Sequence, residues 1–230
     1  MKRSQYIISP LILFLIGMSL VSCKEMDFNY KQFVEGGETV YVGRADSLQV
    51  KGGNQRAELR WLLVSDPKIS SYKIFWNNRA DSLIGNLQKT DQVDTVRVLL
   101  GNLEEKTHEF VVYHLDGNGN TSVRTSVIGR VYGEKYRSTL INRALNSFKR
   151  LNTSQLQINW NQPDAELLFT EIKYNDSSGK AVLLRSGREK EADTLRNFAA
   201  KRSFELRSAF KPVLGIDTFY TDFVLTQLEK

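Results

Sequence analysis

The sequence predicts an all-β protein built from two β-sandwiches in tandem. Short segments with an apolar residue at every second position, typical of strands with one buried face, follow one another from about residue 40. Turn-forming residues separate these segments at short intervals, as in sandwich folds. The strand and turn pattern of the first half returns in the second half, which indicates an internal duplication.

The first predicted sandwich covers residues 40–133. Its clearest strands alternate at Ala57, Leu59 and Trp61 and again at Tyr72, Ile74 and Trp76. A turn is expected between them at 65–68, where Pro67 fixes φ. Further strands are expected at 96–100, 108–112 and 122–132, the last two joined by a Gly/Asn hairpin loop at 116–120.

The second predicted sandwich covers residues 134–230, after a hinge at 133–135. The second-strand pattern returns at Leu156, Ile158 and Trp160, and the third-strand pattern at Ile172 and Tyr174. A hairpin turn at 175–179 follows. The remaining strands are expected around Val182 and Leu184, Phe204 and Leu206, and Phe219 to Phe223. The charged segment Ser186–Arg202 is compatible with a strand or with a short helical turn.

A secretory signal is predicted at residues 1–22. The basic start at Lys2 and Arg3 precedes an apolar run from Tyr6 to Leu20, which contains Pro10. The run has about 15 residues, whereas a membrane-spanning helix needs about 20, so a cleaved signal is favoured over a retained span.

The end of this signal, Leu20-Val21-Ser22-Cys23, resembles a bacterial lipobox. The resemblance implies that the Cys23 thiol carries a diacylglyceryl group and that the chain is anchored to a membrane without spanning it. Residues 23–39 are then a tether. Its charged residues Lys24, Glu25 and Asp27 resemble surface-export signals of Bacteroidota lipoproteins, or they form a solvated linker. The expected location is the outer membrane, on its periplasmic or its surface side.

Composition fits an exported protein without a disulfide framework, because Cys23 is the single cysteine. Removing Lys2 and Arg3 with the signal leaves 30 basic and 26 acidic residues, a net charge of +4. This mild charge favours solubility and attraction to anionic lipid or polysaccharide, and nucleic acid is not an expected partner.

The first predicted sandwich resembles a fibronectin type III module from Leu48 to Tyr132. The features that carry the resemblance are Trp61 on the second strand, Tyr-x-Ile-x-Trp at 72–76 on the third, Leu103 before a tight turn, and the Gly/Asn loop with Ser122. The chain departs from the family at Glu109, where the spacing of that family places a tyrosine. The resemblance implies an immunoglobulin-like sandwich, and the internal repeat implies a second one after it.

The whole chain is also similar to an uncharacterised family of Bacteroidota lipoproteins, a domain of unknown function. The matching segments are 40–43, 54–61, 66–69, 74–78, 81–83, 102–105, 116–122, 132–136, 140–143 and 216–221. The resemblance implies a lipoprotein of gut-type bacteria, often encoded near glycan-uptake systems. It implies no known activity.

Neither histidine is expected to bind a metal. His108 and His114 lie six residues apart on one predicted strand, which places them about 20 Å apart. No other cysteine or histidine completes a site. No metal or cofactor is therefore expected.

The loop that begins at Asp116 imitates a calcium loop, with oxygens also at Asn118 and Asn120. However, Thr121 stands where that loop needs glycine, and Val127 stands where it needs a bidentate glutamate. A polar turn is the favoured interpretation.

Catalytic motifs are also missing, and the chain is predicted not to be an enzyme. There is no G-x-S-x-G nucleophile elbow, and the Gly-Asn-Gly-Asn run joins two strands, so it opens no phosphate-binding helix. Carboxylates are plentiful, but no cleft signature pairs them.

Exposed aromatic rings are the remaining candidates for ligand binding, because such rings stack on sugars. Trp61, Trp76 and Trp160 all fall in core phase. Phe75 and Tyr113, together with Val111, are expected on the outward face, where adjoining strands would join them in one apolar stripe. This stripe either binds a ligand or packs against the second sandwich.

The sequence therefore predicts a lipid-anchored binding or scaffold protein of the cell envelope, accessory to glycan acquisition. Its expected partners are a membrane, through the N-terminal lipid, and a polysaccharide or an envelope protein. The alternative is a structural or adhesive module that binds a protein partner at the cell surface.

Overall fold

The computed structural model describes residues 42–64, 66–90, 92–198 and 203–226. The chain from Val42 onward forms one compact unit. The predicted signal peptide, the lipidated Cys23 and the tether lie outside the described residues, so they stay predictions. Among the described segments, no helix combines the length and the apolar character needed to cross a membrane.

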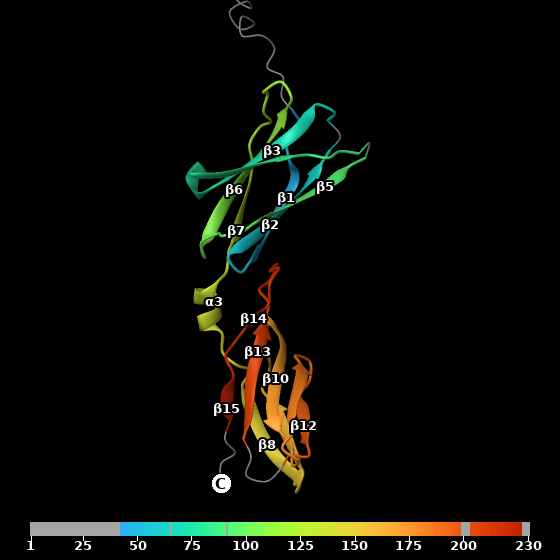
Figure 1. Cartoon of the computed structure of the whole chain (residues 1–230), viewed down its shortest axis with the longest axis vertical. Helices are drawn as coiled ribbons and strands as arrows, with labels where there is room; N and C mark the ends of the chain where they lie inside the picture. The colour runs from blue at the N-terminus through green and yellow to red at the C-terminus, as the bar shows by residue number, and fades with distance from the viewer. Residues whose placement is uncertain (1–41, 65, 91, 199–202, 227–230) are drawn as a thin grey trace, which may run out of the picture. The chain divides into compact units, whose positions relative to one another are not determined.

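The first half of the described chain folds into two antiparallel sheets (Figure 1). One sheet has the order β1-β2-β5, and the other has the order β4-β3-β6-β7. The strands are β1 (Asp46–Gly53), β2 (Arg56–Leu63), β3 (Ile69–Trp76), β4 (Asp81–Asn86), β5 (Asp94–Leu100), β6 (Thr107–Asp116) and β7 (Thr125–Arg130). A single 3-10 turn, η1 (Asn77–Arg79), joins β3 to β4.

The inward faces of these two sheets form one hydrophobic core. Trp61 from β2, Ile74 from β3 and Phe110 from β6 are fully buried in it. The sequence neighbours of Trp61 and Ile74 are more exposed, as the period-two pattern predicts. Trp76 is only half-buried and packs at the edge of this core.

The second half repeats the arrangement. One sheet has the order β12-β9-β8, and the other has the order β11-β10-β13-β14, with β15 also paired to β13. The strands are β8 (Leu145–Asn152), β9 (Gln155–Trp160), β10 (Leu167–Asn175), β11 (Ala181–Gly187), β12 (Ala192–Arg196), β13 (Phe204–Phe210), β14 (Phe219–Tyr220) and β15 (Val224–Thr226). Their core includes Ile158, Trp160 and Ile172. The fold is therefore all-β, with two sandwiches in tandem, as predicted.

The sequence does not predict the helix α3 (Glu134–Thr139), which connects the two sandwiches and was expected to be a hinge. Its N-cap, Gly133, has no side chain to cap the helix. The carboxylate of Glu105 in the first sandwich accepts the backbone N–H groups of Lys135 and Tyr136 at 2.7 and 2.6 Å. A residue remote in sequence thus satisfies donors that would otherwise be unpaired.

Of the two expectations for the charged segment Ser186–Arg202, the structure shows strands and not a short helical turn. Over its described part it contains no helical turn, because β11 runs to Gly187 and β12 follows at Ala192–Arg196. Asp193 in β12 accepts a hydrogen bond from the Trp160 indole at 2.8 Å, which fixes this strand to β9. Residues 199–202 lie outside the described part.

The larger sheets of the two sandwiches share the order of three strands. β3 lies between β4 and β6, and β10 lies between β11 and β13. Ile74 and Ile172 are the fully buried central residues of β3 and β10. Aligning these two residues makes Lys73 the equivalent of Glu171 on the outward face.

Hydrogen bonds also join the sandwiches. Asp217, in the segment before β14, accepts the backbone N–H of Asn54 at 2.7 Å and the Nε–H of Arg56 at 2.9 Å. The N–H of Ile216 donates to the carbonyl of Gly52 at 2.9 Å. The domain boundary expected at residue 133 stays a prediction.

Candidate functional site

The two predicted ligand-binding residues, Phe75 and Tyr113, lie together on the outward face of β3 and β6. Their ring centroids are 6.1 Å apart and the rings are nearly perpendicular, at 87°. Val111 is the strand partner of Phe75 and is itself buried. Two of the three residues of the expected stripe, Phe75 and Tyr113, are therefore partly exposed and in contact across the hydrogen-bonded neighbours β3 and β6, whereas Val111 is buried.

Cationic side chains lie over the aromatic rings of this stripe. The Lys73 ammonium lies 4.6 Å from the Phe75 centroid. The Arg79 guanidinium lies 5.4 Å from the Phe75 centroid and 5.6 Å from the Tyr113 centroid, and it donates a hydrogen bond to the Tyr113 hydroxyl. These partners all belong to the first sandwich. They compete with a sugar for the ring faces, so the stripe presents charge as well as apolar surface.

A hollow of about 310 Å³ adjoins this stripe. Asn78 and Arg79 from the β3–β4 turn line one part of it, and Glu109 and Arg124 line another. Arg124 and Glu109 form an ion pair with each other. The hollow can accept a group about the size of a sugar ring.

Both histidines have hydrogen-bond partners within the first sandwich. The His114 ring accepts a hydrogen bond from the Trp61 indole at 2.9 Å, and its Nδ1 lies 2.8 Å from the Gly43 carbonyl. The Nδ1–H tautomer satisfies both contacts, and burial lowers the pKa of His114. His108 Nε2 lies 2.8 Å from the Glu104 carbonyl. Over the described residues, no group of three or more metal-ligating side chains forms.

The loop at Asp116 folds as a polar turn. The Asp116 carboxylate accepts the backbone N–H groups of Asn118 and Asn120 and the side-chain amide of Asn120, at 2.7 to 2.9 Å. The hydrogen bond from the Asn120 side chain is the main cause that lowers the pKa of Asp116. Gly119 supplies the positive φ, 89°, that the turn requires. The carboxylate oxygens are used within the loop.

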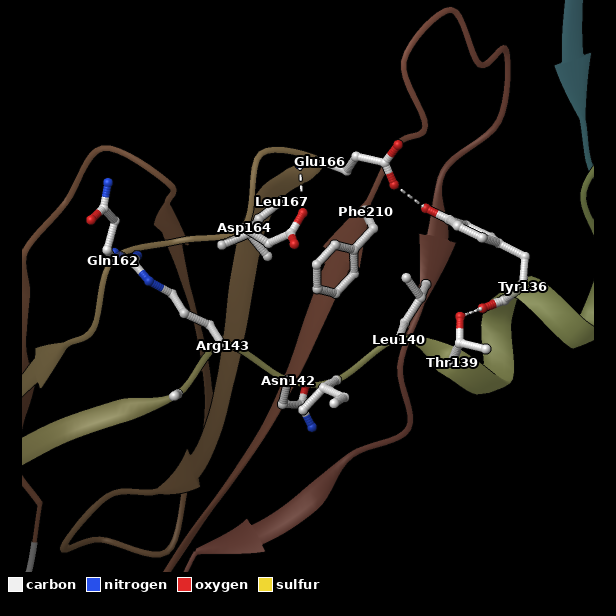
Figure 2. Close-up of a pocket in the computed structure, with 12 residues that line it drawn as sticks. Tyr136, Thr139, Leu140, Asn142, Arg143, Gln162, Asp164, Glu166, Leu167 and Phe210 are labelled. Atoms are coloured by element: carbon white, nitrogen blue, oxygen red, sulfur yellow. Dashed lines mark hydrogen bonds between the residues drawn. The ribbon is translucent and has the colours of Figure 1, made fainter.

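A second hollow, of about 410 Å³, lies beside α3 (Figure 2). The Tyr136 hydroxyl donates to Glu166 at 2.6 Å. Burial and this hydrogen bond together raise the pKa of Tyr136 far above its usual value. Glu166 also accepts the backbone N–H of Val213 at 3.2 Å. Its carboxylate is thus used to hold α3 and the loop before β14.

Arg143 separates this hollow from a larger one. Figure 2 shows its side chain extending toward Gln162. Arg143 is only 7% exposed, and its guanidinium carbon lies 5.3 Å from the centroid of the Trp160 ring. The guanidinium donates hydrogen bonds to the backbone carbonyls of Asn161, Gly187 and Lys190. Burial lowers the pKa of Arg143. This arginine stabilises the floor between the two hollows.

The larger hollow is a groove of about 1030 Å³ on the second sandwich. Amide side chains line it: Asn146, Gln157, Asn159, Asn161 and Gln162. The charged residues of the turn 188–191, which leads into β12, also line it. The Gln157 amide donates to Asn159 at 3.0 Å, and Asn159 donates to the Ser147 hydroxyl at 2.9 Å. Amides that both donate and accept suit hydroxyl-rich ligands.

This groove was not predicted from the sequence. Its signal was the outward phase of Gln157 and Asn159, which alternate with buried Leu156, Ile158 and Trp160. Asn161 and Gln162 continue the amide row beyond the end of β9. The charged turn at 188–191 comes close because β12 pairs with β9.

Comparisons with known proteins place the chain in a family. A family model described as DUF4998, a domain of unknown function, matches residues 23–219. No curated protein matches significantly. Similar solved structures include the chicken CNTN1 FN1-FN3 domains, at 11% identity and a TM-score of 0.43, with 82% of this chain and 65% of that chain covered. This chain therefore spans slightly less than two thirds of that structure. A two fibronectin type-III domain segment from chicken tenascin is also similar, at 13% identity and a TM-score of 0.32, with 82% and 100% covered.

Proposed function

Since the chain belongs to the DUF4998 family, a domain of unknown function, we propose a function from its own residues. The protein is a lipid-anchored binding module of the bacterial cell envelope. It holds glycan near the outer membrane and is accessory to glycan acquisition. It performs no catalysis itself.

The anchor in this proposal is the lipobox-like sequence that ends at Cys23. Each buried methylene of an acyl chain contributes about 0.8 kcal/mol, so several chains together hold a protein stably on a membrane. Mass spectrometry of the native chain tests the anchor. Acylation at Cys23 is expected, and an unacylated thiol would overturn it.

The amide-lined groove of the second sandwich is the observation that carries glycan binding. Its volume, about 1030 Å³, exceeds that needed for one sugar ring, and its lining offers donors and acceptors in a row. Gln157 and Asn159 are half-buried and already oriented by hydrogen bonds. A polysaccharide would therefore bind without the full cost of ordering these side chains.

Affinity electrophoresis of the full chain in a neutral detergent, through gels that contain neutral polysaccharides, tests this groove. Retardation by at least one polysaccharide is expected. The double variant Gln157→Ala and Asn159→Ala should lose it, whereas Gln49→Ala, which removes an exposed amide from β1, should keep it. Unretarded migration of the parent chain on every polysaccharide would overturn the groove as a glycan site.

A structural or adhesive role is the second candidate, and the bonds between the sandwiches favour it. Asp217 and Glu105 each bind backbone N–H groups across the joint, which suits a module that holds a partner at a fixed place. Co-purification from intact envelopes distinguishes the two candidates. A stable protein partner that soluble sugars do not displace would favour the adhesive role.

A further inference from the structure

The outward face of β3 and β6 carries two cations on one aromatic ring. Lys73 and Arg79 both lie over Phe75, at 4.6 and 5.4 Å from its centroid. Among the ion pairs of the described residues, none includes either cation. Both cations lie within 5.4 Å of the same ring centroid, so an anion beside this ring would be attracted to both.

The second sandwich also carries cations over aromatic rings, together with a carboxylate. On the matching face, Arg185 lies 4.1 Å from the Phe169 centroid and Arg207 lies 4.7 Å from the Tyr220 centroid. Both arginines form ion pairs with Glu171, at 2.8 and 2.7 Å. Glu171 is 3% exposed, so a buried carboxylate neutralises this cation-aromatic face from within.

The first sandwich has a lysine where that carboxylate stands. In the strand register, Lys73 lies opposite Tyr113 on β6, as Glu171 lies opposite Arg207 on β13. The nearest carboxylate that lines the adjoining hollow, Glu109, is already paired with Arg124. Both faces thus carry cations over aromatic rings, but the first has a lysine, and not a carboxylate, at the position of Glu171.

We infer that the Lys73–Arg79 face of the first sandwich binds the carboxylate or sulfate group of an acidic polysaccharide. The anion supplies the negative charge that Glu171 supplies in the second sandwich, and it pairs with Lys73 and Arg79. This goes beyond the proposed function, because it adds a second site of different chemistry from the amide groove.

The adjoining hollow favours a saccharide as the carrier of the anion. At about 310 Å³ it has room for a sugar ring beside the cations, and it combines the apolar Val111 with the amide of Asn78. The turn that carries Arg79 has three successive residues with positive φ, Asn77, Asn78 and Arg79, at 49°, 52° and 68°. This left-handed turn holds Arg79 over the rings of Phe75 and Tyr113.

Binding of the full chain, in a neutral detergent, to polygalacturonate and to chondroitin sulfate tests the inference. We expect retention on at least one of them that weakens as salt rises, and a loss of about tenfold or more in affinity for Arg79→Gln. Lys73→Glu, which builds the carboxylate of the second sandwich into the first, should abolish binding. Arg97→Gln is the matched control, because Arg97 is exposed on β5 of the opposite sheet. Thermal unfolding of each variant verifies that the variant is folded. If a variant is not folded, Arg79→Lys is tested in its place.

Three results would overturn the inference. Equal losses for Arg79→Gln and Arg97→Gln would show a general charge effect. Retention on anionic lipid vesicles, with none on either acidic polysaccharide, would assign the cations to a membrane. Full competition by millimolar free sulfate would show that no saccharide is recognised. Retention on neutral polysaccharides through the amide groove should not change in any Lys73 or Arg79 variant.

Discussion

Asp217 in the second sandwich forms an ion pair with Arg56 at the start of β2 in the first. The same carboxylate accepts the backbone N–H of Asn54. The hydrogen bond from Arg56 is the main cause that lowers the pKa of Asp217. One side chain thus satisfies a strand end of the other sandwich, which makes this contact more specific than a surface ion pair.

Replacing Asp217 should loosen the joint between the sandwiches. In Asp217→Ala, the Asn54 N–H and the Arg56 guanidinium lose their acceptor, so backbone amides at 52–56 should exchange hydrogen faster while the cores at Trp61 and Trp160 stay protected. Hydrogen exchange followed by mass spectrometry measures this. Asp222→Ala, which removes another carboxylate of the same sandwich that is paired with Arg137, is the control. Unchanged exchange at 52–56 would contradict the role of Asp217.

A glycine at the same joint should resist substitution. A Cβ at Gly52 would lie 1.8 Å from the Arg130 carbonyl, a backbone atom that cannot move away cheaply. We expect Gly52→Ala to lower the free energy of unfolding by about 1 to 3 kcal/mol. A Cβ at Gly101 would meet nothing within 4 Å, so Gly101→Ala is the control and should be near neutral. Equal unfolding midpoints in urea for the two variants would contradict this reading of the packing.

The sequence predicted the features that depend on local alternation. Strand phase places Trp61 and Ile74 in the core and Phe75 on the outward face. Phe75 also lies next to Tyr113, because β3 and β6 adjoin, as expected for a sandwich of this kind. The features it missed need partners that are distant along the chain. The helix α3 receives its cap from Glu105, and the joint pairs Arg56 with a residue 161 positions away.

Protonation of His114 should destabilise the first sandwich. Its ring is fully buried and accepts the Trp61 indole N–H, which only a neutral ring can do. Burial lowers the folded-state pKa of His114 below its unfolded value of about 6.5, so the unfolded chain binds the proton first. The contribution of the neutral ring is fully present above pH 6.5 and is lost as the pH falls from there toward the lowered folded pKa.

Urea unfolding between pH 7.5 and pH 5, followed by tryptophan fluorescence, measures this effect. The free energy of unfolding should fall with pH over this range. Carboxylates such as Asp66 and Asp217 titrate at lower pH, because hydrogen bonds lower their pKa values, so they do not produce this change. Stability that stays constant from pH 7.5 to pH 5 would contradict the neutral, buried assignment.

Removing the carboxylate of Glu171 should leave the cations of the second face without a paired anion, as in the first face. In Glu171→Gln, Arg185 and Arg207 keep their aromatic contacts but lose their common anion. Because both arginines are partly exposed, solvent screens them, and we expect a cost of about 1 to 2 kcal/mol in the free energy of unfolding, below the range for a fully buried pair. Added sulfate should restore part of this loss in Glu171→Gln, since an external anion can replace the missing carboxylate.

Glu205→Gln, which breaks a more exposed pair with Lys173 on the same face, is the control and should cost less. Equal losses in the two variants, with no response to sulfate, would show that neutralisation by Glu171 does not hold the second face together.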